Sequence, residues 1–387
     1  MTILEITAVP FTQNHVGGGE RAPSELMREL SKYEEVVGCF SMMDSDVFDF
    51  ERKFIVPAKF VSIPPFITIH NPVPDFHTFA AIRKFLRSNE GEIEFIHIHN
   101  LRTAMSTTWL LLSGLMKPDL KYKIILTDHL ARFFPFPKIS SSFVDYYAAV
   151  SKVSEQQLQS YASRPSVILP PAVSSNFSDK SRSPPFEQRG IDLLFLGRIL
   201  PQKRPDILIK FTEYLITRGH KGIKTVIAGR ASDKVYLDDI EKTIRDKKLE
   251  PNISIIDQPS DEDLIPLFSS SKVNVLFSTT KDVYGKRRSH PELAPFTVIE
   301  AASCGTPSLL SDFPGAEEQV IHGKTGFIID ENDMSSALSI LDRLISCEQV
   351  WNPMSFSARQ FVLSERTFPI VTRNFVRFLN SIRNGEL

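Results

Sequence analysis

The sequence contains few cysteines and no apolar run long enough to cross a membrane. Cys39, Cys304 and Cys347 are the only cysteines in 387 residues, and their wide separation excludes a disulfide framework and a metal-ligand spacing. Cysteines used in this way favour a reducing cytoplasm. The most apolar stretch, residues 109–116, is far shorter than the roughly 20 residues that a membrane span needs. The first residues also lack the basic and apolar regions of a signal peptide. We therefore expect a cytoplasmic protein that is not integral to a membrane.

The chain also lacks an excess of charge of either sign. Its 45 lysines and arginines nearly balance its 46 aspartates and glutamates, which gives a net charge of -1. This balance offers no general attraction to nucleic acid, so an anionic ligand must be held by local groups. A hydrophobic content of 42% and a length of 387 residues are typical of a globular protein with two domains.

Short apolar, strand-like runs alternate with amphipathic helical stretches in both halves of the chain. Strands are predicted at residues 3–8, 36–40, 95–99, 123–127, 148–150, 167–169, 192–196, 225–228, 253–256, 273–277 and 308–310. Helices are predicted at residues 23–31, 76–87, 103–116, 152–161, 205–217, 235–247, 261–269, 296–303, 334–345 and 368–382, with Ser151 capping the fourth. This alternation predicts an α/β fold with two doubly wound, Rossmann-like parallel sheets. Ligands of such sheets bind at the carboxyl ends of the strands, so we expect the active site in the cleft between the two domains.

A polar stretch rich in proline and serine separates the two halves. It extends from Pro170 and Pro171 to Pro184 and Pro185, and its composition is typical of an interdomain linker. We predict a first domain at residues 1–172, a linker at 173–190, a second domain at 191–366 and a final helical segment at 367–387.

Cations gather where the first strand of the second half ends. Gly197 and Arg198 follow that strand, and Lys203 and Arg204 precede a helix that begins near Pro205. A helix N-terminus offers N–H groups and a favourable dipole, and the cations add point charges. The combination predicts a site for a diphosphate, and a solvated basic loop is the alternative interpretation.

Two glutamates flank the start of a predicted helix in the sequence HPELAPFTVIEAASCGTP, residues 290–307. Glu292 falls on the loop before the helix, and Glu300 lies about one turn inside it. A carboxylate accepts two hydrogen bonds and suits a sugar diol, while N–H groups at the helix start can hold a phosphate. Surface acids that complement the helix dipole are the alternative, but the apolar residues around the two glutamates favour a buried site.

This Glu-x7-Glu pattern, with its Glu-Ala-x-x-x-Gly-Thr-Pro continuation, resembles the signature of the retaining GT-B glycosyltransferases called family 4. Gly197, Arg198 and Lys203 are similar to the diphosphate-binding segment of that family. The resemblance extends to residues 315–318 and 323–327. It implies two facing Rossmann-like domains, with the acceptor at residues 1–172 and a nucleotide sugar at residues 191–366. It also implies a last helix that crosses back to the first domain.

The resemblance implies roles for individual residues as well. Arg198 and Lys203 would neutralise the donor pyrophosphate, Glu300 would hold the ribose, and Glu292 would hold the transferred sugar. Backbone N–H groups near three further residues would reach the sugar or the phosphate: Ala294, Phe296 and Thr297. Pro295 stands where the family often has glycine, and it has no N–H to offer. The reaction would be a metal-independent, retaining transfer of a hexose that needs no cofactor, and no residue is predicted as a metal ligand.

Two features of the first half resemble the first domain of the same family. Gly17 and Gly18 lie in a Gly-Gly-x-Glu-Arg segment whose glycines would face the donor phosphate or the acceptor. His129 ends a strand and would contact the transferred sugar as a catalytic residue, with a structural histidine as the alternative. A dinucleotide-binding fingerprint at Gly17, Gly19 and Ala22 is disfavoured, because residues 10–16 separate it from the preceding strand.

Two other groups of the first half have open interpretations. His97 and His99 share one face of a strand, and we interpret them as structural because no third ligand is apparent nearby in the sequence. Residues 132–138 form an apolar segment with a cation at each end. This segment could contact an acceptor lipid or a membrane surface, or it could pack on its own domain.

The function predicted from these features is transfer of a sugar from a nucleotide-diphospho-sugar to a hydroxyl acceptor. The acceptor would be a glycan, a glycolipid or a small molecule. A non-catalytic binding subunit of GT-B fold and a sugar-nucleotide epimerase of that fold are the alternatives.

Overall fold

The computed structural model describes residues 2–7, 18–40, 53–55, 62–63, 67–68, 83–99, 110, 113–119, 121–127, 142–287, 292 and 294–387. The chain divides into two compact units. The first unit comprises Met1–Pro170 and Val371–Leu387, and the second comprises Pro171–Ile370. No helix within these described residues is both long and apolar enough to span a bilayer.

A parallel sheet forms the centre of the first unit. Within the described residues its strand order is β3-β2-β1-β6-β7-β8-β9, and neighbouring strands are parallel. The elements are β1 (Thr2–Thr7), α1 (Gly18–Leu30), β2 (Glu35–Phe40), β3 (Lys53–Ile55), β6 (Ile93–His99), β7 (Lys123–Thr127), β8 (Tyr146–Ala149), α5 (Lys152–Tyr161) and β9 (Ser166–Ile168). A separate antiparallel pair joins β4 (Ser62–Ile63) and β5 (Ile67–Thr68). The chain adds strands on one side of β1 and then, from β6 onward, on the other, which is the predicted doubly wound arrangement.

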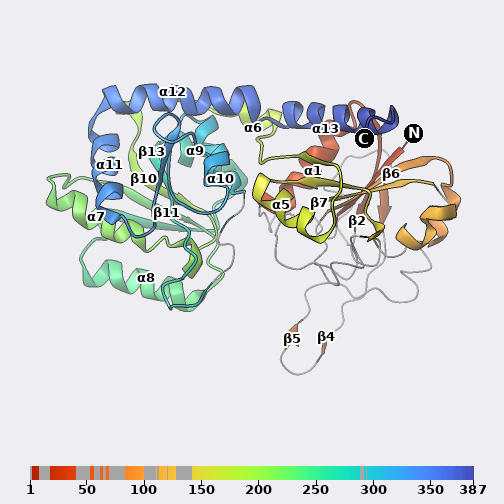
Figure 1. Cartoon of the computed structure of the whole chain (residues 1–387). Helices are drawn as coiled ribbons and strands as arrows, with labels where there is room; N and C mark the ends of the chain where they lie inside the picture. Colours follow the sequence, from red (N-terminus) through yellow and green to blue (C-terminus); the bar gives the residue numbers. More distant parts are fainter. Residues whose placement is uncertain are drawn as a thin grey trace. The chain divides into compact units, whose positions relative to one another are not determined.

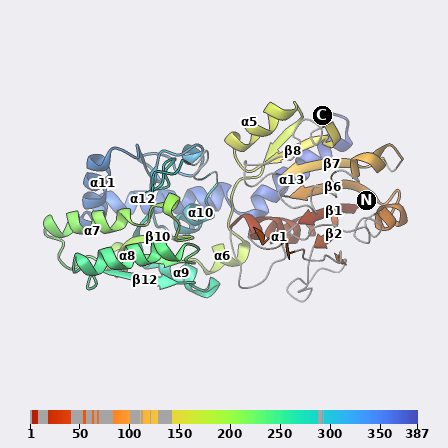
Figure 2. The ribbon, with the colours of Figure 1, turned by 90° about the horizontal axis from the view of Figure 1, so that it is seen from below.

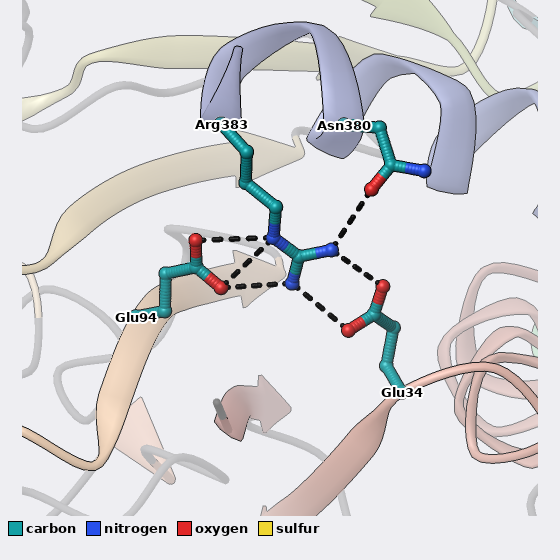
Figure 3. Close-up of polar contacts among 4 residues, drawn as sticks. All are labelled: Glu34, Glu94, Asn380 and Arg383. Carbon is teal, nitrogen blue, oxygen red and sulfur yellow. Dashed lines mark hydrogen bonds and ion pairs between the residues drawn. The ribbon is translucent and has the colours of Figure 1, made fainter.

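The last helix, α13 (Phe368–Arg383), begins in the second unit and belongs to the first unit from Val371 onward. Its apolar stripe packs on the first sheet, where the Phe375 ring lies 5.1 Å from the His97 ring and the Phe378 ring lies 5.8 Å from the Tyr146 ring. Near its end, Arg383 donates hydrogen bonds to the carboxylates of Glu34 and Glu94 at 2.7–3.0 Å (Figure 3). A bidentate guanidinium with two carboxylates has well-defined geometry, so this end of the helix is fixed on the first unit.

The second unit is also built on a parallel sheet, with the strand order β12-β11-β10-β13-β14-β15 among the described residues. Its strands are β10 (Ile191–Leu196), β11 (Thr225–Gly229), β12 (Ile253–Asp257), β13 (Ser271–Leu276), β14 (Ser308–Ser311) and β15 (Gly326–Ile329). Its longer helices are α7 (Ile207–Thr217), α8 (Lys234–Asp246), α9 (Asp261–Ser269), α10 (Phe296–Ser303), α11 (Met334–Ser346) and α12 (Glu348–Glu365). Helices α7 and α8 lie side by side in both views (Figures 1 and 2).

The core of the second unit occupies both faces of its sheet. One buried cluster combines Leu193 and Phe195 of β10 with α7, α8 and α11. A second cluster combines Leu194 and Leu196 of the same strand with Phe268 of α9 and with α10. Because alternate residues of a strand point to opposite faces, the continuous apolar run of β10 is what a strand covered on both sides requires.

Most of the predicted alternation is confirmed by the observed elements. Helices α5, α9 and α10 have the predicted bounds, and the Ser151 hydroxyl caps α5 by accepting a hydrogen bond from Ser154 N at 3.1 Å. β3, β4, β5, β15 and α12 have no counterpart in the sequence interpretation. β15 has only four residues, and α12 contains Pro353, a residue that normally ends a helix.

Residues 173–190, whose composition indicated a linker, carry α6 (Ser175–Lys180) and a 3₁₀ turn, η2 (Phe186–Gln188), within the second unit. Buried Arg189 follows them and lies under the Trp351 ring, 4.4 Å from its centroid. The guanidinium donates hydrogen bonds to backbone carbonyls in three different segments, those of Pro184, Ser271 and Cys304. The donor–acceptor distances are 2.6–3.1 Å. This part of the chain is therefore tied into the second unit.

Candidate functional site

The topology of the second sheet defines a switch point between β10 and β13. From β10 the chain moves outward through β11 and β12, and it then returns to place β13 on the other side of β10. The helices that follow two such strands diverge, and ligands of doubly wound sheets bind at the carboxyl ends next to that position. The loops after β10 and β13 therefore form the candidate site within this unit.

The loop after β10 carries the predicted cations on a tightly constrained backbone. Gly197 has φ +159 and Gly229, at the end of β11, has φ +144. A Cβ atom on Gly229 would lie 1.8 Å from the Gly197 carbonyl oxygen, so only glycine allows the two strand ends to approach this closely. Lys203 ends the following 3₁₀ turn, η3 (Pro201–Lys203). The close approach thus positions the loop that presents Lys203.

Lys203 and Glu292 form an ion pair between the lysine Nζ and the carboxylate Oε1. The two side chains are 15% and 12% exposed, so the pair is largely shielded from solvent. The buried Ser278 hydroxyl, just after β13, donates a further hydrogen bond to Glu292 Oε1 at 3.4 Å. Two loops that are far apart in the sequence, the one after β10 and the one after β13, therefore meet at one carboxylate.

A backbone contact joins the two loops of the site. The N–H of Thr279, next to Ser278, donates to the Gln202 carbonyl at 2.9 Å. The Ser278 carbonyl in turn accepts from the Ser311 hydroxyl at 2.5 Å. The sequence interpretation missed Ser278, Thr279 and Ser311, although small hydroxyl residues directly after buried strands were an available signal.

Helix α10 carries the second glutamate. Glu300 is buried in the middle of this helix, only 4% exposed, as predicted for an acid inside an apolar segment. Pro295 is the N-cap residue. Ala294 precedes it, and the first N–H groups of the helix come from Phe296 and Thr297, where N–H groups have no carbonyl within the helix to bond.

The two remaining cations of the loop differ in their surroundings. Arg204 has the left-handed conformation, with φ 53, and its guanidinium donates to both carboxylate oxygens of Asp206 at 3.0–3.3 Å. Arg204 is therefore committed to a structural contact. Arg198 is exposed, and no polar contact joins it to the part of the chain that the structure describes. Arg198 thus faces solvent, whereas Lys203 is paired with Glu292, a carboxylate of the candidate site itself.

The structure describes few of the site residues predicted in the first half of the chain. Gly17, His129 and the apolar segment 132–138 lie outside the described residues, and Gly18 is the first residue of α1. Their roles stay predictions.

The expectation that His97 and His99 have no third partner is wrong. Glu5 on the adjacent strand β1 joins them, with His97 Nδ1 at 3.0 Å from Oε1 and His99 Nε2 at 2.8 Å from Oε2. His97 Nε2 also lies 2.8 Å from the Thr127 hydroxyl. Parallel pairing of β1 with β6, which sequence periodicity does not specify, brings these groups together.

Burial, charge and hydrogen bonds together shift the pKa values of Glu5 and His99 in this cluster. Burial alone would raise the pKa of Glu5, but the charge of His97 and hydrogen bonds from both histidines outweigh it and lower the pKa to about 2. Burial and the charge of His97 lower the pKa of His99 to about 4, against the opposing effect of Glu5. The three side chains bond to one another beneath α13, on the face of the sheet that Phe375 covers.

The fold with these features, two doubly wound parallel-sheet units in one chain, is the GT-B fold. A solved structure of Anabaena HepE in complex with UDP superposes with a TM-score of 0.74, over 98% of this chain and 100% of that one. Sequence identity in this superposition is 14%, so the likeness establishes the fold. The predicted fold class is confirmed.

Sequence comparisons add a family match over most of the second unit. Residues 176–361 match the family model described as Glycosyl transferases group 1. The capsular polysaccharide biosynthesis glycosyltransferase CapM of Staphylococcus aureus is 22% identical over 188 residues, which cover 48% of this chain and 45% of that protein. The D-inositol 3-phosphate glycosyltransferase of Rhodococcus jostii is 22% identical over 210 residues, which cover 51% and 44%. The chain thus spans less than half of the length of these curated relatives.

Proposed function

We propose that this protein is a glycosyltransferase that moves a sugar from a nucleotide-diphospho-sugar to a hydroxyl acceptor, with retention of the anomeric configuration. The observation that carries the proposal is the placement of Lys203 and Glu292 together at the switch point of a sheet within a Glycosyl transferases group 1 match. A cation and a carboxylate side by side suit a donor that has an anionic half and a hydroxyl-rich half.

The charges of the loop after β10 supply the catalytic contribution in this proposal. When the glycosidic bond to the diphosphate breaks, negative charge grows on the leaving phosphate oxygen. Arg198 and Lys203 stabilise that charge, and fixed charges of this kind typically contribute about 3 kcal/mol each to lowering the barrier. Hydrogen bonds from the first N–H groups of α10 add to the same effect.

The two glutamates recognise the sugars of the donor. Glu300, held inside α10, accepts hydrogen bonds from the ribose hydroxyls, and Glu292 accepts them from the transferred sugar. Retention follows if the leaving phosphate takes the acceptor proton on the same face of the ring, which requires no carboxylate nucleophile. His129 and the glycines at 17 and 18 complete the donor and acceptor contacts in this proposal.

We also propose that transfer needs no metal ion, because two side-chain cations are available to balance the diphosphate. Metal-dependent transferases would instead hold the diphosphate through a coordinated cation. The proposed setting is the cytoplasm, with an acceptor that is free or presented at a membrane surface.

A panel of nucleotide sugars tests the proposal. The purified chain is mixed with UDP-, GDP- and ADP-sugars, and its thermal midpoint and slow release of nucleoside diphosphate are measured. The nucleotide sugars of one base should raise the thermal midpoint, since a ligand that binds only the folded state stabilises it. Lys203→Ala should lower the rate of donor hydrolysis about a hundredfold. Binding without hydrolysis would favour a non-catalytic subunit, and failure of every nucleotide sugar to bind would refute the proposal.

A further inference from the structure

Lys203 has a partner within the protein itself. Its ammonium contacts the Glu292 carboxylate, and both side chains are more than four-fifths shielded from solvent. In such surroundings the attraction between opposite charges is several times stronger than in bulk water. An incoming diphosphate must therefore compete with Glu292 for the ammonium.

Hydrogen bonds around the pair hold both partners in place. Ser278 donates to the carboxylate at 3.4 Å and is itself buried, and the Thr279–Gln202 contact of 2.9 Å fixes the turn that presents Lys203. The neighbouring cation cannot substitute, because Arg204 is occupied by Asp206. The competition is thus confined to one ammonium, while Arg198 is exposed to solvent.

We infer that donor binding exchanges the partners of this ion pair, an inference that rests on the proposed function. Lys203 turns from Glu292 to the donor diphosphate, and the released carboxylate accepts hydrogen bonds from hydroxyls of the transferred sugar. The carboxylate is shielded from water, so it must regain partners when it loses the ammonium. The sugar of an intact donor provides them.

The product cannot provide the same compensation. A nucleoside diphosphate has the anionic half of the donor but lacks the sugar hydroxyls, so binding it leaves Glu292 without replacement donors and close to a like charge. The Lys203–Glu292 pair therefore favours the intact donor over the product, and its return to the original state promotes product release. Glu292 acts in this way as a specificity-determining residue for donor over product.

Calorimetric binding of a nucleoside diphosphate tests the inference. The probe is whichever of UDP, GDP and ADP binds the wild-type chain most tightly. Glu292→Gln should bind this probe about tenfold more tightly, the change expected for removing an interaction of about 1.4 kcal/mol that competes with the ligand, while its preference for the nucleotide sugar over the probe should fall. The matched control is Glu213→Gln, which removes a carboxylate from the exposed pair with Lys247 and should leave the affinity unchanged.

A second background separates partner exchange from simple repulsion between Glu292 and the diphosphate. In Lys203→Met, Glu292→Gln should tighten probe binding clearly less than it does in the wild-type background, because only the repulsion between the carboxylate and the diphosphate is left to remove. Glu292→Asp, which retains the charge but shortens the side chain, should also bind the probe more tightly than wild type and remains informative if Glu292→Gln fails to fold.

The outcomes are distinguishable. Unchanged or weaker probe binding by Glu292→Gln, or equal tightening in the Lys203→Met background, would overturn the partner exchange while leaving the proposed function standing. If no nucleoside diphosphate or nucleotide sugar binds the wild-type chain, the proposed function itself fails.

Discussion

Replacing Arg189 should lower the thermal midpoint of the second unit, although this arginine lies in a segment whose composition resembles a linker. Arg189 is 3% exposed. Its guanidinium donates to the Ser271 carbonyl at 2.6 Å, the Thr306 hydroxyl at 2.7 Å and the Cys304 carbonyl at 2.9 Å. Burial lowers its pKa only to about 10, so the group is charged at neutral pH. These contacts join the start of β13, the end of α10 and the turn before β14 through a single side chain.

The magnitude follows from the contacts that Arg189→Met would remove. Methionine fills a similar volume, but the Cys304 carbonyl would stay buried without this donor, and the Ser271 carbonyl would keep only the longer hydrogen bond from the Thr306 hydroxyl, at 3.3 Å. Each unsatisfied buried group costs about 1–3 kcal/mol, and we expect a loss of about 3–5 kcal/mol in total. For a unit of this size, 1 kcal/mol corresponds to about 2–4 °C. The thermal midpoint of the second unit should therefore fall by about 10 °C.

Differential scanning calorimetry measures this change on the full chain. The control is Arg182→Met, because Arg182 is exposed and its guanidinium contacts only the nearby carbonyls of Asp179 and Ser181 in the part of the chain that the structure describes. The control should unfold within about 1 °C of wild type, as is usual for surface changes. A shift below about 3 °C for Arg189→Met, or equal shifts for both variants, would refute the reasoning.

Three further predictions concern pH, backbone geometry and metal. Because the pKa of His99 is lowered from 6.5 to about 4, the unfolded chain takes up its proton first as pH falls. The contribution of neutral His99 to the free energy of unfolding is complete above about pH 6.5 and is lost towards pH 4, with about 2 kcal/mol lost at pH 5. In His99→Gln the thermal midpoint should therefore change less between pH 7.5 and 5 than in the wild type, and an equal change in both proteins would contradict this. Gly229→Ala, which places Cβ 1.8 Å from the Gly197 oxygen, should impair donor binding and lower the midpoint, whereas Gly190→Ala has no atom within 4 Å to meet and should do neither. Excess EDTA should leave sugar transfer unchanged, and loss of activity restored by Mg²⁺ or Mn²⁺ would disprove metal independence.

Local sequence pattern was sufficient for much of the fold and for part of the site. The uninterrupted apolar run of β10 is what a strand covered on both faces requires, and both faces of its sheet are covered. The position of Glu300 inside an apolar helix predicted its burial. Both are short-range properties, because the period of a strand or helix determines which neighbours share a face.

Other features could not be predicted because they depend on contacts between distant segments. Nothing in the sequence around Lys203 indicates that its ammonium pairs with Glu292, which lies in a distant segment of the second unit. In the same way, Glu5 meets His97 and His99 only because β1 and β6 pair in one particular register.

The sequence by itself determined two doubly wound units, the loop of cations after β10 and the two glutamates around α10. Tertiary structure alone decided that Lys203 pairs with Glu292, that Ser278 supports the carboxylate, and that α13 is fixed by Arg383 on the first unit. The physical reason is that side-chain periodicity depends on residues that are close in the sequence, whereas these charge pairs form only when strand order and loop conformation bring distant residues together.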